Sequence, residues 1–184
     1  PYDEYLINTA EEDSKEVREA VAKYDAQELE DMIFDCGACA SIVRDRTEWE
    51  ESAVGKAVLA MPVVKVEKCE DGPLPGWGKA NEKGPLSGIK VLDLTHIIAG
   101  PACSRTLAEY GADVLLVRRG SFMDQEQCMN EYDGWAGKRL IDLDFRIPEQ
   151  LERARELIRE ADVITYTYRN GSLDKFGLSE EDIR

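Results

Sequence analysis

Residues 85–120 read PLSGIKVLDLTHIIAGPACSRTLAEYGADVLLVRRG, and this stretch decides the fold. A short apolar strand near 90–94 leads into a loop whose Gly-Pro pair opens a helix over 102–110. A glycine ends that helix, and a second apolar strand near 113–118 runs into two arginines. This order predicts a βαβ unit whose helix N-terminus directs free backbone amides toward the sheet edge, where anionic ligands often bind. The same pattern also fits a βαβ unit that binds no ligand.

The second half of the chain continues this α/β pattern over residues 88–184. Strands are expected near 139–143 and 162–167, with a helix near 148–161 between them. Before this unit, residues 68–87 hold several glycines and prolines between charged residues, which is typical of an extended linker. The sequence therefore predicts a parallel sheet preceded by a linker.

Residues 1–67 predict a separate α+β segment. Apolar residues at helical spacing between Val17 and Tyr24 indicate a first helix, and Asp25 with Glu28 indicates the capping box of a second helix that ends at Gly37. A strand of small residues is expected at 40–43, then a third helix capped by Thr47, and an apolar strand at 63–66.

Composition excludes several classes of partner. The chain has 184 residues, which suffices for one or two domains with a real core. Its formal net charge of −15 argues against binding to nucleic acid or to an anionic membrane, because both need clustered positive charge. No run of 18 apolar residues and no signal-like N-terminus occurs, so we expect a cytoplasmic protein. The first residue is Pro1 and a helix-start signal lies just before Arg184, so we expect a piece of a longer protein.

The five cysteines form no closely spaced disulfide framework, which fits a reducing compartment. They are Cys36, Cys39, Cys69, Cys103 and Cys128. The Cys36-x-x-Cys39 pair is interpreted as small core residues rather than as a redox or zinc site. Zinc would need a second pair of ligands, and the single histidine, His96, is far away in the sequence. We therefore expect no metal site.

Six short blocks between residues 85 and 178 carry a resemblance to a known family. They are VLDLT with the following AGP, GADV, Gly137-Lys138-Arg139 with Asp142-Leu143-Asp144, Pro148-Glu149, Glu160-Ala161-Asp162-Val163, and Tyr168 to Leu173 with Phe176-Gly177-Leu178. Each block is weak alone, but their order closely resembles the N-terminal part of the family III CoA-transferases. The fold expected is α/β, the Rossmann-like parallel-sheet head of such an enzyme.

Residues 1–67 are similar to the C-terminal part of the same family, although an unrelated α/β cap also fits. The resemblance therefore suggests the tail of one transferase repeat joined to the head of a second. Family members form interlocked dimers, and the linker 68–87 would suit wrapping around a partner. The partner expected is a second copy or the rest of a tandem-repeat chain.

The resemblance implies contacts with coenzyme A on four segments. They are Ile98 and Ala99; Arg119; Leu143, Asp144, Phe145 and Arg146; and Thr167, Tyr168, Arg169 and Lys175. Backbone amides at the first segment and cations at the others would hold phosphates, and Tyr168 could flank the adenine. The chain departs from the family pattern at Ile98, Arg118, Thr167 and Asn170.

The reaction that the resemblance implies moves CoA between an acyl-CoA and a small carboxylic acid. An aspartate attacks the thioester and forms a mixed anhydride. We expect no permanently bound cofactor and no catalytic residue in this chain. Its strand aspartates are interpreted as turn or cap acceptors, and His96 as a loop hydrogen-bonding residue rather than a base.

Two other functions fit the sequence less well. One is a non-catalytic transferase-like repeat that serves as a dimer scaffold. The other is a dinucleotide-binding oxidoreductase module, which would need a G-x-G-x-x-G run that AGPACS does not supply.

Overall fold

The computed structural model describes residues 14–68, 84–118 and 134–183. The chain divides into two compact units, Pro1–Cys69 and Glu70–Arg184. The expected Arg119, and most of the expected linker 68–87, lie outside the described residues.

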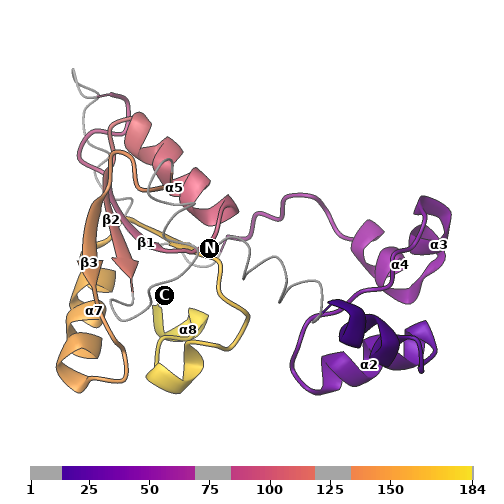
Figure 1. The fold of residues 1–184 in the computed structure, drawn as a ribbon. Helices are drawn as coiled ribbons and strands as arrows, with labels where there is room; N and C mark the ends of the chain where they lie inside the picture. Colours follow the sequence, from indigo (N-terminus) through magenta and orange to yellow (C-terminus); the bar gives the residue numbers. More distant parts are fainter. Residues whose placement is uncertain (1–13, 69–83, 119–133, 184) are drawn as a thin grey trace, which may run out of the picture. The chain divides into compact units, whose positions relative to one another are not determined.

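The second unit is built on a four-stranded parallel sheet (Figure 1). Its strands are β1 (Lys90–Leu94), β2 (Asp113–Arg118), β3 (Arg139–Asp142) and β4 (Val163–Tyr166). Their order is β3-β2-β1-β4, so β1 pairs with β2 on one side and with β4 on the other. The α/β fold class and the four expected strands are confirmed.

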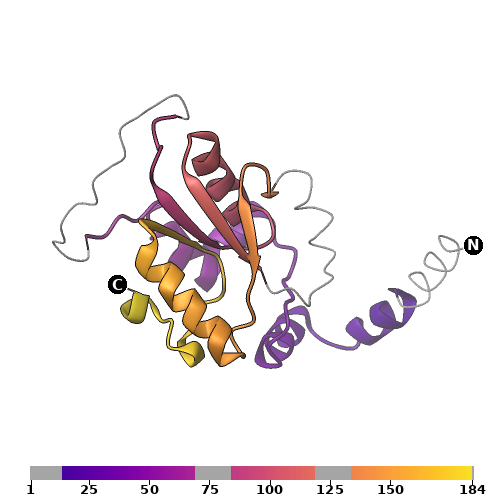
Figure 2. The ribbon, with the colours of Figure 1, turned by 90° about the vertical axis from the view of Figure 1, so that its left-hand side faces the viewer.

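Helices α5 (Ala99–Glu109) and α7 (Pro148–Glu160) lie on opposite faces of this sheet (Figure 2). Side chains alternate along β1 and supply both faces. Val91 packs with the residues beneath α5, whereas Leu92 and Leu94 pack with those beneath α7. This double burial explains why the strands read as apolar runs in the sequence.

Helix α5 begins at Ala99, three residues before the predicted start. Pro101 therefore occupies the first turn, where its missing N–H costs nothing because the first amides of a helix have no partner within it. The helix runs into the positive-φ residue Gly111, as predicted. Residues 84–86, assigned to the linker by the sequence, pack against this end, since the amide of Leu86 donates to the carbonyl of Tyr110 at 2.9 Å.

The chain ends in two short elements, a 3₁₀ turn (Asp174–Phe176) and helix α8 (Glu180–Ile183). The turn places Leu173 and Leu178 in the core beneath α7. The α/β core thus extends to the C-terminal residues that the structure describes.

The first unit is helical where the structure describes it. A helix over 14–21 precedes α2 (Ala26–Asp35), α3 (Arg46–Glu51) and α4 (Ala53–Leu59). The strands predicted at 40–43 and 63–66 are wrong, since neither segment forms a β-strand. A strand is stable only with a hydrogen-bonding neighbour, and the described part of this unit supplies none.

The start of α3 also differs from the prediction. Asp45 rather than Thr47 caps it, by accepting a bond from the amide of Glu48 at 2.8 Å. In turn, the side chain of Glu48 accepts a bond from the amide of Asp45 at 2.9 Å, which completes a capping box. The capping box therefore lies two residues earlier than predicted.

Candidate functional site

The four predicted segments all follow the carboxyl ends of strands. Residues 98 and 99 follow β1, Arg119 follows β2, residues 143–146 follow β3, and residues 167–169 follow β4. In parallel sheets the carboxyl ends of all strands lie at one edge, and ligands bind there. We call this the carboxyl edge. The topology thus brings the described segments to one side of the sheet.

The loops after β1 and β4 are joined by direct contacts. The backbone amide of His96 donates to the hydroxyl of Thr167 at 3.2 Å, and the His96 ring nitrogen Nδ1 lies 3.3 Å from the same hydroxyl. The imidazole stacks on the ring of Tyr168, with centroids 4.5 Å apart and an interplanar angle of 15°. His96 therefore has the loop-bonding position that the sequence suggested.

The loop between His96 and α5 has an unusual backbone. Ile97 has a φ of 70°, the left-handed region that a β-branched residue rarely adopts. Ile98 is exposed and Ala99 opens the helix, so both are accessible at the carboxyl edge. Gly100 is buried beneath them and leaves no room for a side chain. A Cβ there would lie 2.4 Å from the Cβ of Thr95 and 2.6 Å from Cγ2 of Thr167.

The ends of β2 and β3 are joined by an ion pair. The guanidinium of Arg118 donates to both carboxylate oxygens of Asp142, at 3.1 and 3.3 Å. It also lies 4.7 Å from the ring centroid of Trp135. Arg118, which stands where the family commonly has an acid, is thus already engaged. Its charge is balanced within the sheet.

The segment after β3 divides between core and surface. Leu143 is buried in the core, so only its backbone could contact a ligand. Phe145 is half-buried and packs edge-on against Phe176, with ring centroids 5.9 Å apart. Arg146 is exposed and forms a bidentate pair with Asp144. The hydrogen bonds and the charge of Asp144 raise the pKa of Arg146 above its usual value.

The last segment is exposed. The side chain of Arg169 faces solvent, and its carbonyl accepts a bond from the Tyr166 hydroxyl at 3.1 Å. The Nζ atom of Lys175 lies 5.1 Å from the ring of Phe176. Lys175 therefore lies beside the pair of rings, Phe145 and Phe176, that joins this segment to the segment after β3.

A buried polar cluster beneath the carboxyl edge escaped the sequence prediction. We define it as Asp93, Thr95, Ser104, Lys138 and Thr165. The side chains of Asp93 and Lys138 are fully buried, and their charged atoms lie 2.8 Å apart. Lys138 also donates to Ser104 at 2.7 Å and to the carbonyl of Pro101 at 3.0 Å.

The carboxylate of Asp93 is saturated. One oxygen accepts bonds from Lys138 and from the Ser104 hydroxyl, the latter at 2.5 Å. The other accepts from the amide and hydroxyl of Thr95 and from the hydroxyl of Thr165. A buried charge is tolerated only with such compensation. Asp93 accepts the amide of Thr95 two residues on, as the turn-acceptor interpretation expected, and the Asp of the LDLT block is in addition the ion-pair partner of the Lys of the GKR block.

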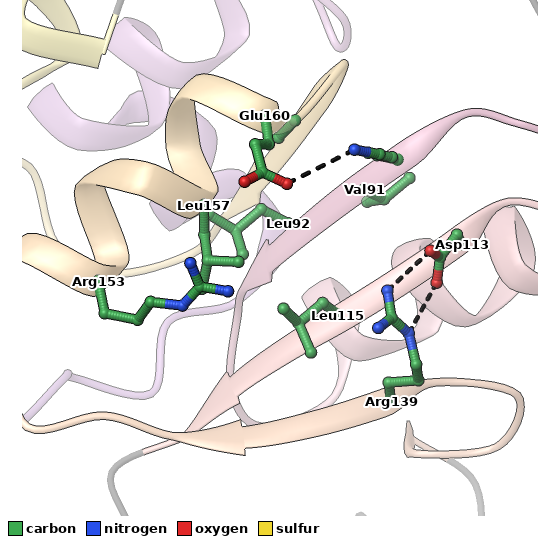
Figure 3. A pocket seen from close by; sticks show the side chains of 10 residues that line it. Val91, Leu92, Asp113, Leu115, Arg139, Arg153, Leu157 and Glu160 are labelled. Atoms are coloured by element: carbon green, nitrogen blue, oxygen red, sulfur yellow. Dashed lines mark hydrogen bonds and ion pairs between the residues drawn. The ribbon is translucent and has the colours of Figure 1, made fainter. Parts of the chain in front are cut away.

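A cavity of about 170 Å³ lies at the opposite edge of the same unit (Figure 3). Its lining includes the first residues of three strands, Lys90, Asp113 and Arg139. Two of its cations face carboxylates, since Arg139 pairs with Asp113 at 2.7 Å and Lys90 with Glu160 at 3.5 Å. These two cations are thus engaged by carboxylates, as Arg118 and Arg146 are at the carboxyl edge.

The cysteine pair does not have the expected setting. Cys36 and Cys39 are both exposed, so their interpretation as core residues is wrong. Cys36 instead caps the end of α2 with its backbone amide. Across the described ranges, no group of three His, Cys, Asp or Glu side chains is arranged to hold a metal. Within those same ranges, no helix is long and apolar enough to cross a bilayer.

The family model described as CoA-transferase family III matches residues 86–184. An acyl-CoA transferase of Gibberella moniliformis is 34% identical over 168 residues, which cover 90% of this chain and 29% of that protein. A formyl-CoA:oxalate CoA-transferase of Escherichia coli is 36% identical over 110 residues, 54% of this chain and 26% of the enzyme. The chain thus spans about three tenths of the length of these curated relatives.

A solved structure shares the fold. The hypothetical protein Rv3272 of Mycobacterium tuberculosis matches with a TM-score of 0.50 and 28% identity. The match covers 55% of this chain and 29% of that one.

Proposed function

The chain belongs to CoA-transferase family III, and on this basis we propose that it is part of an enzyme that moves CoA from an acyl-CoA to a small carboxylic acid. In this proposal the α/β unit is the head that binds CoA at the carboxyl edge. The enzyme's own aspartate attacks the acyl-CoA thioester, which forms a mixed anhydride and releases the CoA thiolate. The thiolate attacks the aspartyl carbonyl, so the donor acid leaves and an aspartyl-CoA thioester remains. The acceptor carboxylate attacks this thioester, and the released thiolate then attacks the acceptor carbonyl of the new anhydride, which gives the acceptor's CoA thioester and regenerates the aspartate.

One observation carries the assignment of the site. The contacts of His96 with Thr167 and Tyr168 join the loops after β1 and β4 beside the start of α5. The loop that carries Tyr168 is thereby joined to the loop that leads into α5, a helix whose first amides have no side-chain cap. An adenine needs a flat apolar surface and a pyrophosphate needs N–H donors, and both kinds of group are present there.

Cations complete the site in this proposal. Arg146 would bind phosphate by exchanging the carboxylate of Asp144 for a phosphate oxygen, a bidentate geometry that guanidinium groups favour. Arg169, Lys175 and Arg119 would add positive charge along the same edge. The exchange lowers the gain in free energy from Arg146, because one charge-assisted contact replaces another.

The nucleophile of the proposed reaction is not assigned to a strand aspartate. Asp93 is saturated within the buried polar cluster. Asp113 and Asp142 pair with arginines on the neighbouring strand, and Asp162 accepts the backbone amide of Lys90 at 2.8 Å. We therefore place the catalytic aspartate elsewhere in the enzyme, and no permanently bound cofactor takes part.

The proposed setting of the enzyme is the cytoplasm, as an interlocked homodimer or as one repeat of a tandem chain. The formyl-CoA:oxalate relative acts on a small dicarboxylate according to its name, which supports a small carboxylic acid as acceptor here.

A non-catalytic scaffold is the second candidate. The observation that favours it is the pairing of Arg118 with Asp142 on the neighbouring strand and of Arg146 with Asp144 two residues before it. A site whose cations are neutralised by neighbouring carboxylates binds phosphate less strongly than one with open cations.

Isothermal titration of the 184-residue chain with CoA tests the proposal. We expect Arg146→Ala to weaken binding by about 5- to 30-fold, because a charge-assisted bond that replaces another contributes roughly 1–2 kcal/mol. Tyr168→Ala should weaken it by about 5- to 150-fold, since stacking on a base contributes about 1–3 kcal/mol. The matched control is Arg153→Ala, another exposed arginine paired with a nearby carboxylate, which lines the opposite cavity.

The result separates the candidates. A loss of affinity with Arg153→Ala, while Arg146→Ala and Tyr168→Ala bind normally, would move the site to the other edge. A wild-type chain that gives no heat of binding with CoA would favour the scaffold.

A further inference from the structure

The side chain of Lys138 is fully buried, so it cannot itself meet a ligand. Its ammonium group donates three bonds, to the carboxylate of Asp93, the hydroxyl of Ser104 and the carbonyl of Pro101. The last two acceptors lie in the first turn and a half of α5. Lys138 thus connects the end of β1 to the start of the helix that borders the carboxyl edge.

The loop between these two points, residues 95–100, is anchored at both ends. Thr95 binds Asp93 through its amide and its hydroxyl. Gly100 packs against Thr95 and Thr167, with no room for a Cβ. Between the anchors, Ile97 has the unfavourable φ of 70°. A β-branched residue keeps such a backbone only where its surroundings impose it.

Stability alone does not account for this arrangement. Buried ion pairs contribute little net stability, and apolar residues of similar volume often replace them without loss. The cluster instead restricts the geometry of one loop, since five hydrogen bonds converge on Asp93 from four segments. Conformational specificity is therefore its expected contribution.

We propose that Lys138 is a positioning residue that, through Asp93 and Pro101, holds the loop 95–100 in the strained conformation that binds CoA. This inference rests on the proposed function for the identity of the ligand. Lys138 sets the direction of the amides of Ile98 and Ala99 without touching CoA. Its loss loosens the loop and weakens binding beyond what lower stability explains.

Three variants of the 184-residue chain test the proposal. Lys138→Met removes the ammonium but leaves the Asp93 carboxylate buried without its counter-charge. The double variant Asp93→Asn with Lys138→Met removes both charges together, and it remains usable where the single variant does not fold. The matched control is Val114→Ala, which removes buried volume from β2 in the core on the α5 side, outside the polar cluster.

Two readouts apply to each folded variant: hydrogen exchange of the amides at residues 95–103 without ligand, and the dissociation constant for CoA by calorimetry. A denaturant midpoint for each gives its stability. We expect the double variant to exchange these amides about tenfold faster and to bind CoA about tenfold more weakly than Val114→Ala at matched stability.

Exchange and affinity within about twofold of the control would overturn the positioning role and leave a merely structural ion pair. Failure of the proposed function is recognised by a different result: the wild-type chain itself then gives no heat of binding with CoA. The exchange comparison, which uses no ligand, then still decides whether Lys138 holds the loop.

Discussion

Substituting Gly100 by alanine sets two energetic effects against each other. In a helix, alanine is more favourable than glycine by about 0.5–1 kcal/mol, and Gly100 lies in the first turn of α5. A Cβ there, however, would lie 2.4 Å from the Cβ of Thr95, well inside contact distance. Thr95 cannot move away easily, because its amide and its hydroxyl are both bonded to Asp93.

The steric overlap should outweigh the gain in helix propensity. Adding a methyl group to a closely packed site costs about 1–3 kcal/mol, which exceeds the gain in helix propensity. We expect Gly100→Ala to lower the free energy of unfolding by about 1–2 kcal/mol. For a unit of about 100 residues this lowers the melting temperature by about 5–10 °C.

Thermal and urea unfolding followed by circular dichroism measure the effect. Ala102→Gly, on the exposed side of the same helix, gives the propensity contribution alone and should also destabilise. Adding Thr167→Ser to Gly100→Ala removes the methyl group 2.6 Å from the new Cβ and should restore part of the loss. A Gly100→Ala protein as stable as the wild type would refute the packing argument.

Two further predictions concern the first unit. The Arg44 guanidinium lowers the pKa of Glu30 from 4.5 to about 2, so the stability from this pair is fully present above pH 4.5. This stability declines as the pH falls toward 2. The amide of Ile42 donates to Glu30 at 2.9 Å, so its NMR signal should report the protonation of Glu30 over this pH range in wild type. In Arg44→Gln the signal should not change over the same range. Asp45→Ala should lower the free energy of unfolding by about 0.5–2 kcal/mol through the lost cap, whereas Thr47→Ala should leave the urea midpoint unchanged. A loss of stability with Thr47→Ala but not with Asp45→Ala would contradict the capping box.

The α/β unit could be predicted from the sequence because its two central strands, β1 and β2, are largely buried. Parallel strands of this kind read as short apolar runs, and β1 and β2 have this pattern. The start of α5 was placed too late because Gly100 and Pro101 resemble a loop, although both are tolerated in a first helical turn. The contacts of the candidate site with CoA stay a prediction.

The first unit shows the limit of pattern reasoning. Val63 and Val64 have strong strand propensity, but they form no strand in the described residues. Propensity reports how well a side chain fits a paired surface, and the sequence does not say whether a partner strand is present. For the same reason, it could not place the exposed Cys36 and Cys39.

The buried polar cluster left one signal in the sequence. Asp93 interrupts an apolar strand, and a carboxylate at such a position must have a counter-charge. Lys138 lies 45 residues later, and the intervening chain offers other cations. The need for a partner was therefore predictable, and its identity required the fold.

The strand order β3-β2-β1-β4 has a consequence for synthesis on the ribosome. Strand β1 is central, but its neighbour β4 comes much later, since Val163 pairs with Val91 across 72 residues. At 5–20 residues per second, roughly 4–14 s pass between the translation of the two. Throughout that interval the apolar face of Leu92 and Leu94 has neither β4 nor the complete α7 to cover it. The nascent chain should therefore be a good substrate for ribosome-associated chaperones, and the last turns of the α/β unit determine when it is released.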